Sequence, residues 1–154
     1  MEIFNLHGDE WDATEEHEGF GFCETGVGTR IAAELIGGSL YEVASGKKLW
    51  PYHLHHANEE WMVVLSGAPT LRTPEGEREL MAGDVACFLR GASGAHQVIN
   101  RTDEPVRVLM LSTLLNPEVL EYPDSGKIAA KDAKGNGVFR TRLGEPVEYW
   151  DGEA

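Results

Sequence analysis

Short apolar runs separated by turn residues dominate the middle of the chain, between positions 30 and 113. Gly, Pro, Asn, Asp and Ser gather between the runs, and the segment Pro74-Glu75-Gly76 has Pro and Gly where a tight turn favours them. Apolar runs of about five residues with close turn signals are typical of strands. The runs predict strands over residues 39–43, 61–65, 70–73, 77–80, 85–89, 96–99 and 105–113.

This spacing of strands predicts an all-β fold, either a sandwich or a closed barrel. None of the runs alternates with a helical pattern of about 10–15 residues, so a parallel sheet built from βαβ units is not expected. The sequence shows no internal repeat and no linker that would divide it in two. We therefore expect one structural domain, which is also the usual number for a chain of 154 residues.

Two flanking segments depart from this pattern. Residues 1–29 are polar and Gly-rich with weak periodicity, so we expect an irregular arm packed on the barrel. Near the C-terminus, Pro117 is expected to open one helical turn over 116–120, and the stretch 123–137 is expected to be a surface loop. The aromatic tail, with Trp150, is expected to dock on the barrel or on a second subunit. The expected division is an arm over 1–29, a barrel over 30–115 and an extension over 116–154.

The charge of the chain narrows its partners. The formal net charge is −13, and the first basic residue, Arg30, follows a run of eight acidic side chains. A negative field repels phosphate backbones and anionic lipids, so neither nucleic acid nor a membrane is expected as a partner. The acidic arm is interpreted as a solvated segment, with an acidic docking segment as the alternative.

Cysteine content and the N-terminal sequence favour a cytoplasmic location. Two cysteines, Cys23 and Cys87, are too few for a disulfide framework, and Cys87 lies in an apolar run where we expect it to be buried. The first residues lack the basic and apolar segments of a secretory signal. No apolar run approaches the ~18 residues that a membrane helix needs.

The segment 51–61 carries the strongest chemical signal. In a strand His53 and His55 would face the same side, roughly 6–7 Å apart, which lets both imidazoles reach one metal ion. Glu60 begins the next apolar strand, and His96 begins a strand after a loop of small residues. Three neutral imidazoles and one carboxylate suit Mn, Fe, Ni, Cu or Zn better than Ca or Mg. A His-x-His alone is a weak signal, because surface or core histidines produce it as well.

Strand alternation also predicts which way the side chains next to these residues point. Glu59 and His56 should point away from the metal, because adjacent strand residues face opposite sides. Met62 and Val64 share the parity of Glu60, so they should line the cavity or belong to the core, since small barrels fill their interiors with side chains.

These spacings resemble the two sequence motifs of the cupin superfamily. The first motif is Gly, His-x-His, Glu and Gly, and the second is Gly, Pro-x-Gly, His and Asn. Three departures lie in loops: six residues separate Gly46 from His53, Leu89 replaces the motif proline, and four residues separate Gly91 from His96. The resemblance covers roughly 38–113, and its positions here are Gly46, His53, His55, Glu60 and Gly67, then Gly83, Leu89, Gly91, His96 and Asn100.

The resemblance implies a double-stranded β-helix, a jelly-roll-like barrel, with one divalent transition metal on His53, His55, Glu60 and His96. It implies a mononuclear metalloenzyme acting on a small oxygenated substrate, with dioxygenase-type or sugar or keto-acid isomerase-type chemistry. The alternative is a non-catalytic cupin that binds or senses a small molecule, and the fold does not choose between them. No general base stands out in the sequence. A homodimer is expected from the resemblance and the aromatic tail.

Overall fold

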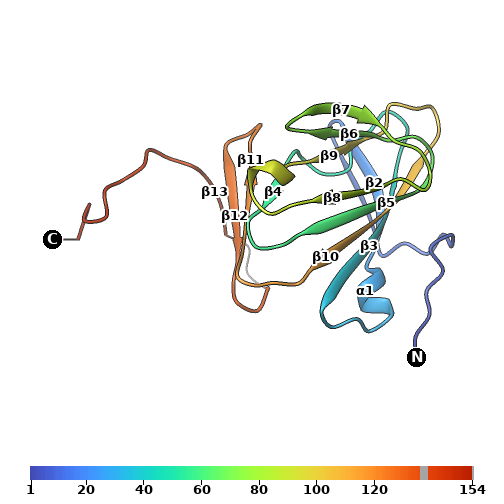
Figure 1. Cartoon of the computed structure of the whole chain (residues 1–154), viewed down its shortest axis with the longest axis horizontal. Helices are drawn as coiled ribbons and strands as arrows, with labels where there is room; N and C mark the ends of the chain where they lie inside the picture. The colour runs from blue at the N-terminus through green and yellow to red at the C-terminus, as the bar shows by residue number, and fades with distance from the viewer. Residues whose placement is uncertain (136–138, 154) are drawn as a thin grey trace.

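Strands make up nearly all of the regular structure, as the apolar runs predict (Figure 1). The computed structural model of the chain describes residues 1–135 and 139–153. Within these ranges the helices are α1 (Val27–Arg30) and the short 3₁₀ turn η1 (Ala92–Gly94), and none is long and apolar enough to cross a membrane. The strands are β1 (Ala13–His17), β2 (Phe20–Thr25), β3 (Ile36–Val43), β4 (Leu54–His55), β5 (Glu60–Ser66), β6 (Thr70–Thr73), β7 (Gly76–Glu79), β8 (Val85–Phe88), β9 (Gln97–Ile99), β10 (Val106–Thr113), β11 (Glu118–Tyr122), β12 (Lys127–Lys131) and β13 (Phe139–Arg142).

The strands form three antiparallel sheets. The largest has the order β1-β2-β3-β10-β5-β8, and a smaller one has the order β7-β6-β9. A third sheet, β13-β12-β11-β4, stands at one end of the other two (Figure 1). Strands far apart in sequence pair directly, such as β3 with β10, and this gives the jelly-roll-like barrel that was predicted.

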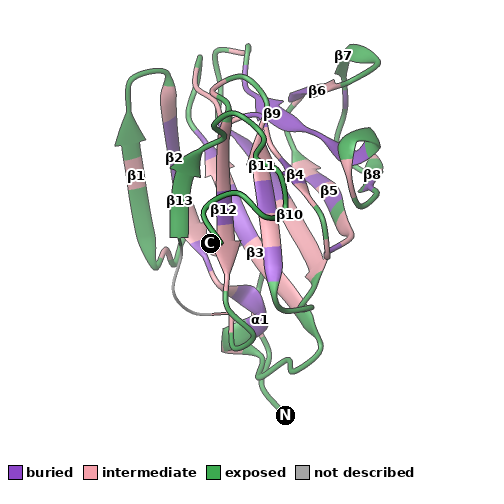
Figure 2. Ribbon diagram, turned by 90° about the vertical axis from the view of Figure 1, so that its left-hand side faces the viewer, coloured by how far each residue is buried: buried purple, intermediate pink, exposed green. Residues whose placement is uncertain are grey.

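The core fills the space between the two barrel sheets. Met62 and Val64 are 0% and 1% exposed, and their neighbours on β10, Val106 and Val108, are 0% exposed. Buried residues alternate with more exposed ones along β5 (Figure 2) because successive side chains face opposite sides. Of the two interpretations of Met62 and Val64, the core is the one observed. Met110, which pairs with Met62, lines the cavity instead.

The expectation of an irregular N-terminal arm is wrong for residues 13–25. There β1 and β2 form a hairpin, and β2 pairs with β3 to extend the largest sheet. Almost all of β1 is exposed, because it is an edge strand. A strand exposed on both faces needs no apolar alternation, so the sequence pattern did not reveal it.

Ion pairs hold the acidic arm against the barrel. Arg30 pairs with Glu10 at 2.9 Å and with Asp12 at 2.6 Å. The buried Arg107 of β10 pairs with Asp9 at 2.9 Å and also donates to backbone carbonyls of the arm. Arg30 and Arg107 therefore neutralise part of the charge of the arm and attach it to the barrel.

The C-terminal segment also differs from its prediction. Residues 118–122 form strand β11 rather than a helical turn, and β12 lies within the stretch expected to be a loop, whose last two residues fall outside the described ranges. Glu118 and Leu120 are buried and alternate with partly exposed residues, which is a strand pattern. The sequence pattern was missed because the inward positions include a carboxylate, Glu118, and a small residue, Ala129.

Cys87 is exposed, so the prediction of a buried thiol is wrong. Phe88 of the same strand is buried and Ala86 is partly buried, whereas Val85 and Cys87 are exposed. The apolar run gives no sign of which parity faces inward, because both faces of β8 carry apolar residues.

The tail after β13 extends away from the barrel (Figure 1). Tyr149 and Trp150 are 82% and 76% exposed and pack on each other with ring centroids 4.8 Å apart. They do not dock on the barrel of this chain, while docking on a second subunit and a homodimer stay predictions.

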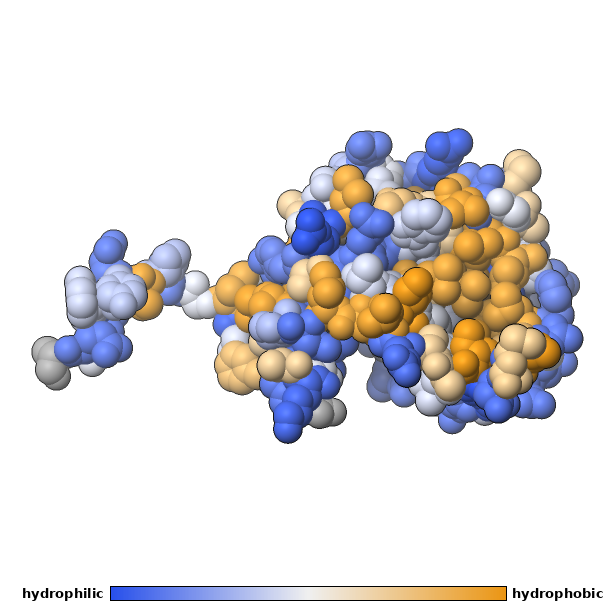
Figure 3. All heavy atoms as spheres, turned by 60° about the horizontal axis from the view of Figure 1, so that its bottom comes forward, coloured by the Kyte–Doolittle hydropathy of each residue, from blue (hydrophilic) through white to orange (hydrophobic). Residues whose placement is uncertain are grey.

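Figure 3 shows that apolar side chains gather on the face below the barrel, and exposed Ile36 and Leu114 lie where β3 and β10 adjoin.

Candidate metal centre

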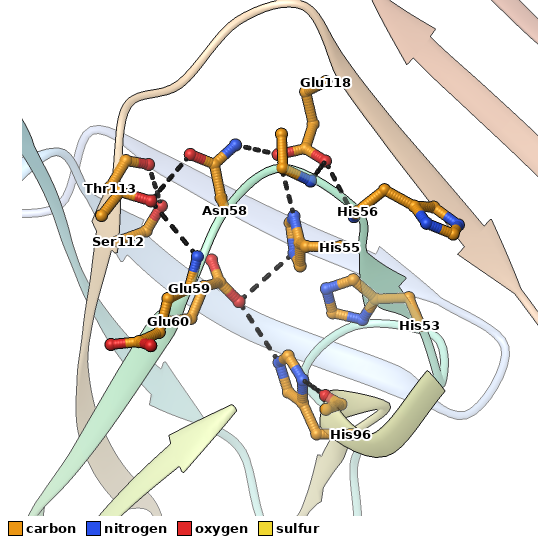
Figure 4. Close-up of polar contacts among 12 residues, drawn as sticks. His53, His55, His56, Asn58, Glu59, Glu60, His96, Ser112, Thr113 and Glu118 are labelled. Carbon is orange, nitrogen blue, oxygen red and sulfur yellow. Dashed lines mark hydrogen bonds and ion pairs between the residues drawn. The ribbon is translucent and has the colours of Figure 1, made fainter. Parts of the chain in front are cut away.

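The backbone brings the two histidine clusters of the sequence together. His53 lies directly before β4 and forms an isolated antiparallel bridge with His96, which lies directly before β9. His53 N donates to His96 O at 3.2 Å, and His96 N donates to His53 O at 2.9 Å. Glu60 is the first residue of β5. Figure 4 shows the side chains of His53, His55, Glu60 and His96 converging on one point.

A tight loop and a stacked ring fix the orientation of His96. A Cβ atom at Gly94 would lie 1.7 Å from the carbonyl oxygen of Leu89, so only glycine fits this turn. The carbonyl of Gly94 accepts a hydrogen bond from His96 Nδ1 at 2.9 Å. The imidazole also stacks on Phe88, with centroids 3.7 Å apart and planes 6° apart. Glycine at position 94 is therefore required for the loop that orients His96.

Two imidazoles are held in the state that binds a metal. His53 Nδ1 donates to the carbonyl of Pro51 at 2.8 Å, as His96 Nδ1 does to that of Gly94. A carbonyl only accepts, so each Nδ1 carries a proton, and Nε2 is the atom of each ring that is left to bind a metal. Burial, together with the neighbouring His96 and His55, lowers the pKa of His53 to about 3, so this ring is neutral at pH 7.

The donor atoms lie close enough to share one ion. One ligand atom each from His53, Glu60 and His96 lies within 4.8 Å of the other two. The Oε2 atom of Glu60 is 3.3 Å from His55 Nε2 and 3.4 Å from His96 Nε2. His96 Nε2 and both ring nitrogens of His55 are buried without a hydrogen-bond partner within the described part of the chain. Buried polar atoms without partners are costly, and a divalent transition metal fits this donor set.

His55 is linked to His53, Glu60 and His96 by its contact with the Glu60 carboxylate. Its Nδ1 lies 3.7 Å from Glu118 Oε2, so the ring lies between two carboxylates. Burial lowers the pKa of His55, but Glu60 and then Glu118 raise it by more, and the net shift is upward. Burial alone would raise the pKa of Glu60, but His55 and His96 bring it well below its usual range. Glu60 is thus ionised, and the assignment of His55 as fourth ligand stays a prediction.

Glu118 is a site residue that the sequence did not reveal. Its carboxylate is 1% exposed and accepts hydrogen bonds from the backbone N–H groups of His56 and Ala57, both at 3.2 Å, and from Asn58 Nδ2. A carboxylate of β11 therefore holds the turn that separates His55 from Glu60 (Figure 4). The alternation of Glu118 with Leu120 was the available signal, but the segment was expected to be helical.

The residues expected to face outward do so. His56 is exposed and pairs with Glu121 at 2.7 Å. The carboxylate of Glu59 accepts a hydrogen bond from Trp61 Nε1 at 3.1 Å and points away from the histidines (Figure 4). The register that selects Glu60 over Glu59 is therefore the observed one.

A cavity of about 420 Å³ opens in front of the cluster. This volume is in the range of small-molecule sites. The barrel contributes apolar and aromatic walls, and the third sheet contributes basic ones. The lining residues outside the cluster include Tyr41, Leu49, Trp50, Val98, Met110, Leu120, Tyr122, Lys127, Ala129, Lys131 and Arg140.

Comparison with known proteins places the fold. Residues 39–112 match the family described as Cupin domain. No curated protein matches the chain significantly. The solved structure of a sugar phosphate isomerase from a cupin superfamily, from Silicibacter pomeroyi, is 26% identical with a TM-score of 0.80, covering 96% of this chain and 97% of that one.

Two further structures extend the comparison. A protein of Acidithiobacillus ferrooxidans, provisionally named a sugar phosphate isomerase, is 25% identical with a TM-score of 0.77, and 88% of each chain is covered. A polyketide cyclase of Streptomyces resistomycificus is 20% identical with a TM-score of 0.59, covering 75% of this chain and 83% of that one. The last resemblance concerns the fold alone.

Proposed function

Because the chain belongs to the cupin superfamily, we propose that it is a mononuclear metalloenzyme that isomerises a small sugar-like substrate. The observation that carries the proposal is the buried cluster at the cavity, in which the Nε2 atom of His96 and both ring nitrogens of His55 lack hydrogen-bond partners among the described residues. The two neighbours named as sugar phosphate isomerases, at 26% and 25% identity, favour isomerisation over oxygenation.

The residues that would hold the ion are His53, His55, Glu60 and His96. A divalent ion in such a centre supplies Lewis-acid polarisation of substrate oxygens. The chain keeps His53 neutral by burial and keeps Glu60 ionised through its histidine neighbours, so both are in the state that binds a cation. The apolar walls of the cavity keep water away from the substrate.

Isomerisation of a hydroxy-aldehyde or hydroxy-ketone moves a proton between neighbouring carbons, which needs a titratable group beside the cluster. No general base stands out in the sequence, but in the structure Tyr122 lines the cavity. The ring of Tyr122 stacks on His53 with centroids 6.1 Å apart, so this hydroxyl-bearing ring flanks the cluster.

The test combines metal content with proton exchange. Elemental analysis should find close to one transition-metal ion per chain. The protein is then incubated in D₂O with a panel of aldoses, ketoses and their phosphates, and NMR should show that a carbon-bound proton of at least one of them exchanges. His96→Ala should lose both, whereas His56→Ala, which removes an exposed histidine of the same segment, should lose neither. A metal-loaded protein that binds a member of the panel but exchanges no proton would make it a binding protein instead.

A further inference from the structure

Three basic residues line the cavity on the inner face of the third sheet. Lys127, Ala129 and Lys131 alternate along β12 and all line the cavity, and Arg140 of β13 pairs directly with Ala129. Directly opposed residues of antiparallel strands share a face, so the three cations project from one side of the sheet. Ala129 is 1% exposed and, being small, leaves space between them.

These cations lack carboxylate partners, unlike two arginines that lie outside the cavity. Arg72 pairs with Asp124 at 2.6 Å and Arg101 with Glu77 at 2.7 Å. Within residues 1–135 and 139–153, no ion pair joins Lys127, Lys131 or Arg140 to an acidic side chain. With 26 acidic residues and a net charge of −13, the chain has carboxylates in excess, yet none in the described part of the chain forms an ion pair with these three.

The acidic residue opposite Lys131 is occupied elsewhere. Glu118 pairs in register with Lys131, but its carboxylate is engaged with the backbone N–H groups of His56 and Ala57 and with Asn58. The Lys127 ammonium lies 5.1 Å from the ring centroid of Tyr122, a cation–π contact that leaves its charge in place. The positive charge at this wall is therefore not cancelled locally.

The same sheet carries one side of the metal centre. One row across it reads His55, Leu120, Ala129 and Arg140, because each is the cross-strand partner of the next. Neighbouring strands lie about 4.8 Å apart, so β12 and β13 stand about 10 Å and about 14 Å from β4. A short carbon chain can span this interval from the cluster to the lysines.

We propose that Lys127, Lys131 and Arg140 form an anion subsite that holds a charged end of the substrate while its oxygenated end reaches the histidine cluster. This rests on the proposed function for the second half of the statement, and on the cavity wall alone for the first. The shared chemistry is an oxyanion group, either a phosphate or a carboxylate. Arg presents a planar fork of donors and Lys a compact charge, and the two together suit a group with several acceptor oxygens.

The test measures anion binding in the absence of catalysis. The full chain, treated with a chelator and desalted, is titrated with inorganic phosphate and separately with acetate at constant ionic strength, followed by NMR shifts of backbone amides in β12 and β13. Saturable binding at these strands is expected for at least one anion. Lys127→Gln with Arg140→Gln should weaken it by about tenfold or more, as expected if 1.4 kcal/mol or more of binding free energy is lost.

The control is Lys134→Gln, which removes one positive charge from the exposed turn of the same hairpin, outside the cavity, and so matches the single variant Lys131→Gln in charge. It should leave binding unchanged, and Lys131→Gln alone serves if the double variant fails to fold. Preference for phosphate supports a phosphorylated substrate, and preference for acetate supports a carboxylate-bearing one. Absence of saturable binding, or equal binding by the double variant and the wild type, overturns the subsite.

The two proposals fail separately. Phosphate binding without proton exchange on any panel member would leave the subsite standing and end the isomerase proposal. Exchange on uncharged sugars with no anion binding would do the reverse.

Discussion

The barrel and the third sheet face the same cavity but present opposite chemistry to it. The barrel presents buried imidazoles and one carboxylate, His53, Glu60 and His96, whose ligand atoms lie within 4.8 Å of one another. The sheet presents Lys127, Lys131 and Arg140 without ion-pair partners in the described ranges. The proposed substrate, which has an oxygenated end and an anionic end, matches this two-sided cavity.

The two sides also differ in how firmly their groups are held. On the barrel side, reciprocal backbone hydrogen bonds join His53 to His96, and Phe88 stacks on the latter. On the sheet side, Arg140 is exposed, and the lysines have long flexible stems. Metal binding requires precisely placed ligands, whereas an anion tolerates mobile donors. The rigid barrel side therefore suits a metal, and the more mobile sheet side suits an anion.

The largest expected effect comes from breaking the barrel side. His96→Ala removes a donor whose Nε2 lone pair points at the centre, so metal affinity should fall by more than about 100-fold, beyond the loss caused by groups that only orient a ligand. Competition with a chromophoric chelator measures it. His56→Ala should retain wild-type affinity, and loss of metal from that exposed variant would place the ion outside the barrel.

The next largest effect is on stability, and it compares a glycine in the loop before His96 with a glycine in the C-terminal tail. Gly94→Ala forces a Cβ atom against Leu89 O, at 1.7 Å, so the loop and His96 must shift. The free energy of unfolding should fall by about 2 kcal/mol or more, measured by urea titration. Gly144→Ala is the control, since a Cβ atom there meets nothing within 4 Å. Equal stability of the two variants would mean that the loop adapts without cost.

A smaller effect is expected at Glu118, a residue of the third sheet that holds a turn of the metal centre. Glu118→Gln replaces a buried carboxylate that accepts from three donors, so the turn before Glu60 should loosen and metal affinity should fall by about tenfold. Glu121→Gln alters the same strand on the opposite, more exposed face, where the carboxylate meets His56. If Glu121→Gln weakened metal binding as much, Glu118 would have no specific role in positioning His55.

The barrel could be predicted from sequence because its signals are local. Alternation from Glu60 to Val64 gives both the core and the ligand parity, and the His53-x-His55 spacing places two donors on one face. The cluster was therefore visible before the fold was, although the identity of a bound ion was not.

The position of the third sheet at the cavity could not be predicted, because it depends on how β4, β11 and β12 pair with one another. Only the pairing of Leu120 with His55 and with Ala129 brings Glu118 and the basic residues to the cavity. That pairing joins distant positions through backbone hydrogen bonds, which leave no periodic trace in the sequence. The edge strand β1 was hidden for a different reason, because it is exposed on both faces and so needs no apolar alternation.

The smallest expected effect concerns the ion pair between the two sides. Arg72 of β6 binds Asp124, in the turn between β11 and β12, through two hydrogen bonds of 2.6 and 2.8 Å. The guanidinium holds the pKa of Asp124 below its usual 3.8, so any stability from the pair is present above that value and is lost as pH falls through the lower folded-state pKa. Since both partners are substantially exposed, Asp124→Asn should cost less than about 1 kcal/mol at pH 7 and nothing once the carboxyl is protonated. Thermal unfolding of wild type and variant from pH 7 down to pH ~2.5 measures the difference, which should shrink only at the acid end. A difference that persisted unchanged at the acid end would show that the amide disturbs the turn itself, and that the pair does not fasten the third sheet to the barrel.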